Sequence, residues 1–160
     1  MDSVEHVRSY LAQFGTSDRV IEFTVSSATV ELAAKALSCE PGRIAKTLSF
    51  MAGDRPIFLV AAGDRRIDNG KYKHTFGTKA RMMTAEELEG LTGLHFGGVC
   101  PFDLPSPAEV WLDESLRAYD IVYPAAGNEA SAVRLTPDEL EAWSHACGWC
   151  DVTKAPALPV

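Results

Sequence analysis

Lys46 is the residue whose type and position point most directly to chemistry. It opens an apolar, strand-like run, Lys46–Ala52. Burying an ammonium group costs free energy unless the group is hydrogen-bonded or reaches water. Lys46 therefore either extends to solvent along its aliphatic stem or faces a polar cavity. The first alternative is a structural role, and the second is a functional one.

A glycine-rich stretch, Gly97–Pro101, is the second candidate. Glycines before a proline mark a turn or bulge. They also let backbone N–H groups approach a ligand closely, because no Cβ intervenes. Cys100 lies inside this stretch, and a nucleophilic cysteine needs a base and a lowered pKa. His95 is five residues upstream, but nothing brings the two together, so we expect a small buried or pocket-lining thiol.

Basic residues concentrate in one segment, although the chain as a whole is acidic. The 160 residues carry a formal charge of −7. Between Arg43 and Arg81 there are nine basic residues against three acidic ones, a segment charge of +6. Such a segment either presents a basic face to phosphates or consists of solvated loop charges.

The pair Cys147-Gly-Trp-Cys150 has the spacing of half a redox or metal site. The chain has no second pair of this kind. His145 would supply a third ligand, which still leaves the ligand set incomplete. We therefore expect reduced, structural cysteines. Neither a metal nor another cofactor is expected.

Composition and length predict one soluble domain over residues 1–160. Hydrophobic residues make up 46% and charged residues 23% of the chain, which is ordinary for a globular protein. No apolar run approaches the ~20 residues that span a bilayer, and the N-terminus lacks a secretory signal. The expectation is a cytoplasmic monomer or weak homodimer without membrane contact, with a loose tail at 155–160.

Hydrophobic periodicity predicts helices and strands in irregular order. Helices are expected at 3–14, 29–38, 69–76, after the capping boxes Thr84-x-x-Glu87 and Thr136-x-x-Glu139, and as one turn at 43–45. Strands are expected at 20–25, 46–52, 56–62, 95–101, 109–113, 119–123, 131–135 and 149–153. The runs 46–52 and 56–62 form a hairpin, and 63–68 is a loop. This order predicts an α/β (α+β) fold with a mixed, mainly antiparallel, curved sheet and peripheral helices.

Three stretches, in this order and spacing, resemble the YbaK/prolyl-tRNA synthetase-associated editing-domain family. They are Ile44–Leu48, Gly63–Asp68 with the lysines that follow it, and Gly97–Phe102, preceded by the helix entry Ser26–Ala33. The resemblance extends from about residue 3 to about residue 153. It implies the editing-domain fold and a free-standing, trans-acting deacylase. Such an enzyme removes a small mischarged amino acid from aminoacyl-tRNA, with tRNA-Pro as the expected carrier and a separate synthetase as a candidate partner.

The resemblance also implies roles for individual residues. Lys46 matches the family's essential lysine, which would anchor the terminal phosphate or ribose. Amides of Gly97 and Gly98 would stabilise the oxyanion, which completes the expected catalytic set. Substrate binding is expected of Thr29, Val99, Cys100, Pro101, Ala126 and Gly127. Contacts with tRNA phosphates are expected of Arg65, Arg66, Lys71 and Lys73.

Two places depart from the family's pattern. Cysteine-editing members carry a serine in the loop after a late strand and an aspartate in the next strand, whereas this chain has alanines there, within Tyr123–Val133. Asp103 stands where a glycine often follows the aromatic residue. Alanine, serine, cysteine and threonine therefore all remain candidate amino acids, because one methylene is worth only ~1–3 kcal/mol.

Three alternative functions are also compatible with the sequence. The first is a non-catalytic module of the same fold that binds a small ligand or nucleotide. The second is a redox or zinc protein that uses Cys147 and Cys150. The third is hydrolysis of another small acyl ester.

Overall fold

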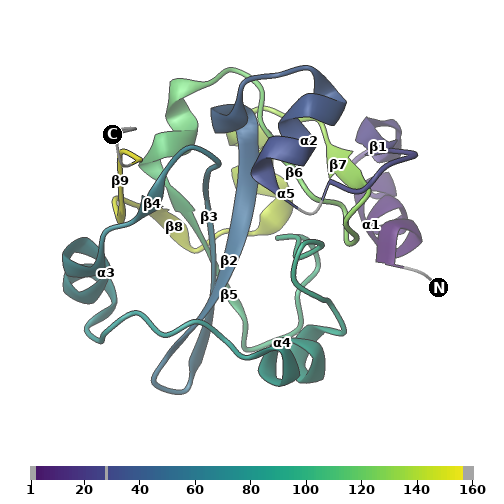
Figure 1. Ribbon diagram of the computed structural model, residues 1–160. Coiled ribbons are helices and arrows are strands. Elements are labelled where there is room, and N and C mark those ends of the chain that lie inside the picture. Colours follow the sequence, from purple (N-terminus) through teal and green to yellow (C-terminus); the bar gives the residue numbers. More distant parts are fainter. Residues whose placement is uncertain (1–2, 28, 157–160) are drawn as a thin grey trace.

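The structure is a computed structural model that describes residues 3–27 and 29–156 (Figure 1). The α-helices are α1 (Ser3–Ala12), α2 (Val30–Leu37), α3 (Asn69–Phe76), α4 (Ala85–Thr92) and α5 (Pro137–Ser144). The 3₁₀-helices are η1 (Ser17–Arg19), η2 (Pro41–Arg43) and η3 (Glu114–Ala118). The strands are β1 (Val20–Glu22), β2 (Ile44–Ala52), β3 (Arg55–Ala62), β4 (Arg66–Ile67), β5 (Glu109–Asp113), β6 (Tyr123–Pro124), β7 (Ser131–Val133), β8 (Gly148–Cys150) and β9 (Thr153–Lys154).

The long hairpin β2–β3 forms the centre of a five-stranded sheet with the order β6-β2-β3-β5-β8 (Figure 1). The expected α/β class, mixed sheet and hairpin are confirmed. Within this sheet, however, antiparallel pairing is confined to β2–β3, whereas β6, β5 and β8 join in parallel. Among the five described strands of this sheet, β2 and β3 are the pair linked by a tight turn, and strands that return through longer connections can pair in parallel. Two short antiparallel ladders, β1–β7 and β4–β9, lie outside the central sheet.

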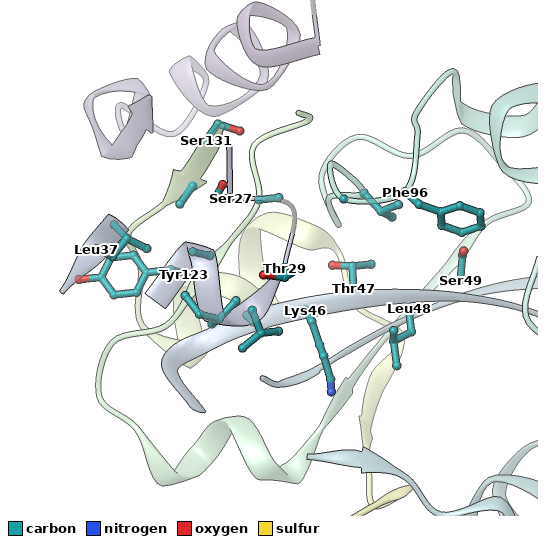
Figure 2. Close-up of a pocket in the computed structure, with 18 of the residues that line it drawn as sticks. Ser27, Thr29, Leu37, Lys46, Thr47, Leu48, Ser49, Phe96, Tyr123 and Ser131 are labelled. Carbon is teal, nitrogen blue, oxygen red and sulfur yellow. The ribbon is translucent and has the colours of Figure 1, made fainter. Parts of the chain in front are cut away.

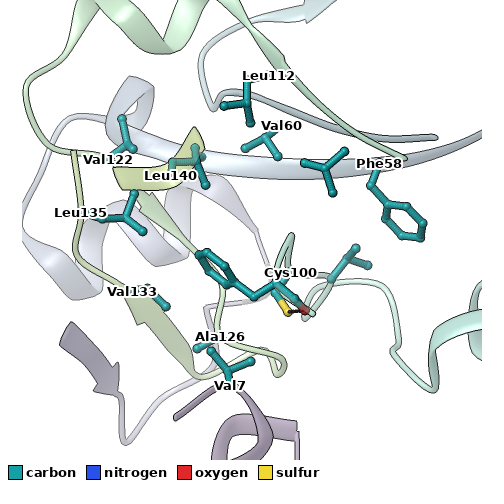
Figure 3. Close-up of a cluster of buried hydrophobic side chains, with 14 of the residues drawn as sticks. Val7, Phe58, Val60, Cys100, Leu112, Val122, Ala126, Val133, Leu135 and Leu140 are labelled. Atoms are coloured by element: carbon teal, nitrogen blue, oxygen red, sulfur yellow. Dashed lines mark hydrogen bonds between the residues drawn. The ribbon is translucent and has the colours of Figure 1, made fainter. Parts of the chain in front are cut away.

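Strand β3 is buried on both faces, which explains its continuous apolar sequence. Phe58 and Val60 pack into a core formed with residues of α1, α4 and α5, part of which is drawn in Figure 3. Ile57 and Leu59 pack on the opposite face, against α3. Alternate residues of β2 are divided between the same two faces, because the side chains of a strand alternate.

The predicted helix starts are confirmed by their caps. Thr84 and Thr136 each form both halves of a capping box, with Glu87 and Glu139 respectively. The Asp68 side chain accepts a hydrogen bond from Lys71 N at the start of α3. Local polar chemistry therefore fixes where these helices begin.

The strand expected at 95–101 is wrong, because these residues form turns and irregular backbone. Gly97 has φ of +93°, which lies outside the extended region. Of the strand expected at 119–123, only Tyr123 is in a strand, as the first residue of β6, and Val122 forms an isolated bridge with Leu135. The apolar character of both segments reflects burial rather than membership of a ladder.

The remaining differences concern element boundaries. Strand β1 ends at Glu22, three residues before the expected end at residue 25. Strand β7 ends at Val133 rather than at residue 135. The expected 63–68 loop contains β4, which pairs with β9, so the expected 149–153 strand is two strands. The helical turn lies at η2 rather than at 43–45, because β2 already begins at Ile44. In the tail, residues 155–156 have no helix or strand, and 157–160 lie outside the described residues.

Candidate active site at an open strand edge

A cavity of about 210 Å³ lies beside the first half of β2 (Figure 2). Its walls are β2, α2 with the residues before it, three residues of the 96–99 loop, and residues of the 123–125 and 131–132 segments. The lining combines apolar side chains of α2 and Ile44 with hydroxyl groups and with Phe96, Gly97 and Val99.

The cavity follows the edge of β2 rather than one face. It contacts every residue from Ile44 to Ser49, although neighbouring side chains in a strand point to opposite faces. Figure 2 shows Thr47 and Ser49 pointing toward the loop that carries Phe96, whereas Lys46 and Leu48 point the other way. A cavity that reaches both sets must lie along the edge between them.

This edge is open at Thr47. Strand β6 pairs with β2 only at Ile44 and Ala45. Further along β2, the segment before α4 takes over: Ser49 O accepts a hydrogen bond from Met83 N, and Met51 N donates one to Arg81 O. Ser49 and Met51 thus direct their backbone groups away from β3. Because this direction alternates along a strand, Thr47 directs its N–H and C=O the same way. In the described part of the chain, no residue pairs with Thr47 on that side.

The Lys46 side chain lines the cavity, but its ammonium group is held on the face opposite Thr47. Nζ donates hydrogen bonds to the carbonyl oxygens of Arg65 and, at 3.5 Å, Gly63. Burial lowers the pKa of Lys46, while the carboxylates of Asp64 and Glu31 act in the opposite direction. The lysine thus brings a partly buried positive charge to the edge of the cavity and ties the 63–65 turn to β2.

Two hydroxyl groups on the other face of β2 have no hydrogen-bond partner among residues 3–27 and 29–156. Thr47 Oγ1 and Ser49 Oγ are both buried and both belong to residues that line the cavity. The side chains of Phe96 and Met82 also line it, and each of these residues is 49% exposed. Buried hydroxyl groups normally have a hydrogen-bond partner. These two are therefore available to hydrogen-bond a ligand in the cavity.

The glycine loop is only partly directed at the cavity. Gly97 and Val99 line it, and no acceptor for Gly97 N is recorded among the described residues. Gly98 N donates to His95 O at 3.1 Å, so this amide is used inside the loop. A Cβ on Gly98 would lie 2.6 Å from Asn128 Cα. Gly98 therefore permits the close packing of two loops.

Cys100, Pro101 and Ala126 are buried and do not line the cavity. Figure 3 shows Cys100 and Ala126 pointing into the hydrophobic core. Burial raises the pKa of the Cys100 thiol to about 11, which opposes the thiolate that nucleophilic attack requires. Gly127 lines a separate hollow of about 160 Å³ together with Gly98.

The remaining predicted residues lie at the start of α2 and around the β4–β9 ladder. Thr29 lines the cavity and its hydroxyl caps α2 by accepting from Leu32 N. Arg65 and Lys71 bond Thr153, and Lys71 also forms an ion pair with Asp151. Arg66 and Lys73 are exposed. The cavity thus brings together Lys46, Gly97, Val99 and Thr29 from the predicted set, and the basic residues lie apart from it.

Thr47, Ser49 and Phe96 line the cavity although none of them was expected from the sequence. The available signal was the polar pair at alternate positions of an otherwise apolar strand, which predicts a polar surface on one face. Within residues 3–27 and 29–156, no cluster of three or more His, Cys, Asp or Glu side chains has an arrangement that could hold a metal ion. None of the helices in this part of the chain is long and apolar enough to cross a bilayer.

The fold and the cavity define a small α/β domain with a ligand-sized pocket at an open sheet edge. The aminoacyl-tRNA editing domain family matches residues 24–142. A crystal structure described as that of a trans-editing enzyme proposed for prolyl-tRNA synthetase superposes with a TM-score of 0.87 at 33% identity, over 97% of this chain and 99% of the other. The chain belongs to the aminoacyl-tRNA editing domain family.

Two further relatives show how this domain occurs. The protein YwhH of Bacillus subtilis is 48% identical over 153 residues, which cover 95% of this chain and 98% of YwhH. The proline–tRNA ligase of Aquifex aeolicus is 33% identical over 90 residues, which cover 55% of this chain and 16% of the ligase. The chain therefore matches nearly all of a protein of similar length, and it matches only a small part of a ligase.

Proposed function

We propose that the protein is a trans-acting aminoacyl-tRNA deacylase that removes a small mischarged amino acid, with tRNA-Pro as the carrier. The observation that carries the proposal is the 210 Å³ cavity at the open edge of β2, in a chain of the editing-domain family. The cavity joins Lys46, the Gly97 loop and unused polar groups. Its size suits a small acyl group and excludes the bulk of a tRNA, which would remain outside in the cytoplasm.

The proposed reaction is hydrolysis of the ester between the amino acid and the terminal ribose. The oxygen of a water molecule attacks the ester carbonyl, and the carbon–oxygen bond to the ribose breaks. The ribose oxygen takes up a proton, which leaves a free amino acid and a tRNA with an intact hydroxyl group. An aminoacyl ester is already activated, so positioning and oxyanion stabilisation supply most of what is needed.

The chain's own residues would position the ester. Gly97 lines the cavity, and its N–H would donate a hydrogen bond to the oxyanion as it develops. The Lys46 ammonium group would attract the terminal phosphate or ribose, at the expense of its bonds to Gly63 O and Arg65 O. Arg66 and Lys73 are exposed and available for phosphates further along the acceptor stem.

A second candidate function is a non-catalytic module that binds a small ligand or nucleotide. Two contacts favour it: the Lys46 ammonium group is already bonded to carbonyl oxygens, and Gly98 N–H is used within its own loop. In this alternative the cavity would bind its ligand and leave the ester intact.

A panel of charged tRNAs tests the proposal. Purified protein is incubated with tRNA-Pro that carries alanine, cysteine, serine or threonine, and with correctly charged prolyl-tRNA as the control. We expect release of at least one of the small amino acids above the spontaneous rate, while the prolyl ester stays intact. Binding of charged tRNA without release of any amino acid would instead support the binding module.

A further inference from the structure

We infer that the aminoacyl group binds by pairing with the Thr47 backbone, as a one-residue antiparallel strand at the open edge of β2. The Thr47 C=O accepts a hydrogen bond from the α-ammonium group, and the Thr47 N–H donates one to the ester carbonyl. This inference rests on the proposed function and adds how the acyl group is held.

Thr47 is isolated on this edge of β2. Its neighbours Lys46 and Leu48 direct their backbone groups toward β3, because the direction alternates and Ser49 points outward. Thr47 is therefore the residue between the β6 pairing and the Ser49–Met83 hydrogen bond whose N–H and C=O both point to the unpaired edge, and Thr47 lines the cavity there. It offers one donor and one acceptor, spaced as in a strand.

The hydrogen-bonding groups of an aminoacyl ester match those of Thr47. An aminoacyl ester has the N–Cα–C=O skeleton of a strand residue, with a donor at one end and an acceptor at the other. In an antiparallel ladder, one class of residue pair exchanges both N–H···O bonds, and this is the pair that Thr47 can form. Extended peptides bind exposed sheet edges in the same way.

Antiparallel pairing with Thr47 also fixes the direction in which the substrate lies. An antiparallel partner places its carboxyl end opposite Lys46 and its amino end toward Leu48. The ribose and phosphate of the substrate would then lie on the side of the Lys46 ammonium group, while the α-ammonium group, of like charge, would lie on the far side. Both placements are electrostatically favourable.

The unpartnered hydroxyls are an independent observation that points to a ligand at this place. Paired residues direct their side chains to the same face, so the acyl side chain would point to the face of Thr47. That face carries Thr47 Oγ1 and Ser49 Oγ, which are both buried and which no residue of the described part of the chain hydrogen-bonds (Figure 2). The acyl group would therefore enter a small polar recess that the protein does not fill itself.

Two esters of the same tRNA test the inference. Alanyl-tRNA contains the α-ammonium group, and propionyl-tRNA differs only in lacking it. Each enzymatic rate is divided by the spontaneous rate of the same ester, which removes the intrinsic difference in reactivity. Because a hydrogen bond to a charged group is at stake, we expect the rate enhancement to be about 10- to 100-fold larger for the alanyl ester.

Two variants then separate backbone from side chain. Thr47→Pro removes the N–H, and Thr47→Val removes the hydroxyl but keeps the N–H and C=O. We expect Thr47→Val to retain the preference for the alanyl ester. We expect Thr47→Pro to lose at least about tenfold in rate, with circular dichroism showing that it is folded. If Thr47→Pro does not fold, the comparison of the alanyl and propionyl esters on the unaltered protein still tests whether the α-ammonium group is bound.

The outcomes separate this inference from the proposed function. Equal rate enhancement for alanyl and propionyl esters would overturn the pairing while leaving the deacylase intact. Loss of the alanyl preference in Thr47→Val would also overturn it, because the side chain rather than the backbone would then be the recognition group. No release from any charged tRNA would refute the proposed function itself.

Discussion

At the scale of residues, the adjacent residues Lys46 and Thr47 of β2 point to opposite faces of the sheet and differ in their hydrogen bonding. Lys46 points to the face of the β4–β9 ladder and bonds two carbonyl oxygens there. Thr47 points to the glycine-loop face and leaves its hydroxyl unbonded. A ligand at the strand edge would contact both, because the edge is the line where the two faces meet. The Lys46 ammonium group supplies positive charge from one face of β2, and the Thr47 hydroxyl group supplies hydrogen-bonding capacity from the other face.

Replacing Lys46 with methionine is expected to lower kcat/KM for aminoacyl-tRNA by about tenfold or more. Methionine keeps the length of the side chain but removes the charge, and a hydrogen bond to a charged group is worth about 1.5–3 kcal/mol. The measurement is steady-state deacylation of the most active substrate of the tRNA panel. Lys35→Met is the matched control, since Lys35 is exposed on α2 and does not line the cavity.

Thermal unfolding of both variants must accompany these rates, because Lys46→Met leaves the carbonyl oxygens of Gly63 and Arg65 without their donor. A folded Lys46→Met protein with unchanged turnover would remove Lys46 from the mechanism. It would leave the lysine with the task of holding the 63–65 turn.

At the scale of elements, short helices are anchored by polar contacts at their ends. Helix α4 starts with the Thr84–Glu87 capping box, and Arg81 adds hydrogen bonds to both carboxylate oxygens of Glu87. These contacts lower the pKa of Glu87 to about 2, with Arg81 as the first cause and the Thr84 N–H as the second. The segment just before α4 bonds the β2 edge next to the cavity, so its position matters for the site.

Acid is expected to remove this contribution of Glu87. Its pKa is lower in the folded protein than the ordinary 4.5, so its stabilisation is present above pH 4.5 and is lost as the pH falls toward 2. Glu87→Gln should therefore be less stable than the unaltered protein at pH 7, and the difference should shrink over that window. Urea unfolding at several pH values measures it, and a difference independent of pH would contradict the assignment.

Thr84→Ala is the companion variant. It removes the cap without removing the carboxylate, and we expect it to cost about 1 kcal/mol. Its effect should persist at low pH better than that of Glu87→Gln.

At the scale of the whole molecule, charge is distributed unevenly. The chain carries −7, yet the basic segment from Arg43 to Arg81 includes β4 and α3, which lie on one side of the molecule (Figure 1). Part of this charge is neutralised locally, for example by the Lys71–Asp151 ion pair. Arg66 and Lys73 remain exposed on β4 and α3. An approaching tRNA would therefore be attracted to this side and repelled elsewhere.

Salt should weaken tRNA binding, and the double variant Arg66→Glu/Lys73→Glu should bind less tightly and less salt-dependently. Each lost phosphate contact lowers the slope of log affinity against log salt by roughly 0.7–0.9. Filter binding or fluorescence anisotropy from low to moderate salt provides the measurement. Lys35→Glu/Arg134→Glu reverses the same number of charges in α2 and after β7, on the other side of the molecule. An equal loss in both double variants would show that net charge alone matters.

The sequence by itself determined the class of fold, the β2–β3 hairpin, the capped helix starts and the family. These features depend on neighbouring residues: alternation of apolar side chains, Thr and Glu three positions apart, and motifs in a fixed order. Lys46 stood out for the same reason, as a charge at the start of an apolar run.

Only the tertiary structure decided which groups share the cavity. Gly97 faces it and Gly98 does not, because Gly98 packs against the Asn128 backbone of a distant loop. Thr47 is open because β6 ends after two residues and the contacts of residues 81–83 begin at Ser49. Whether a strand edge is open depends on where the neighbouring segments end, and these segments lie far from β2 in the sequence.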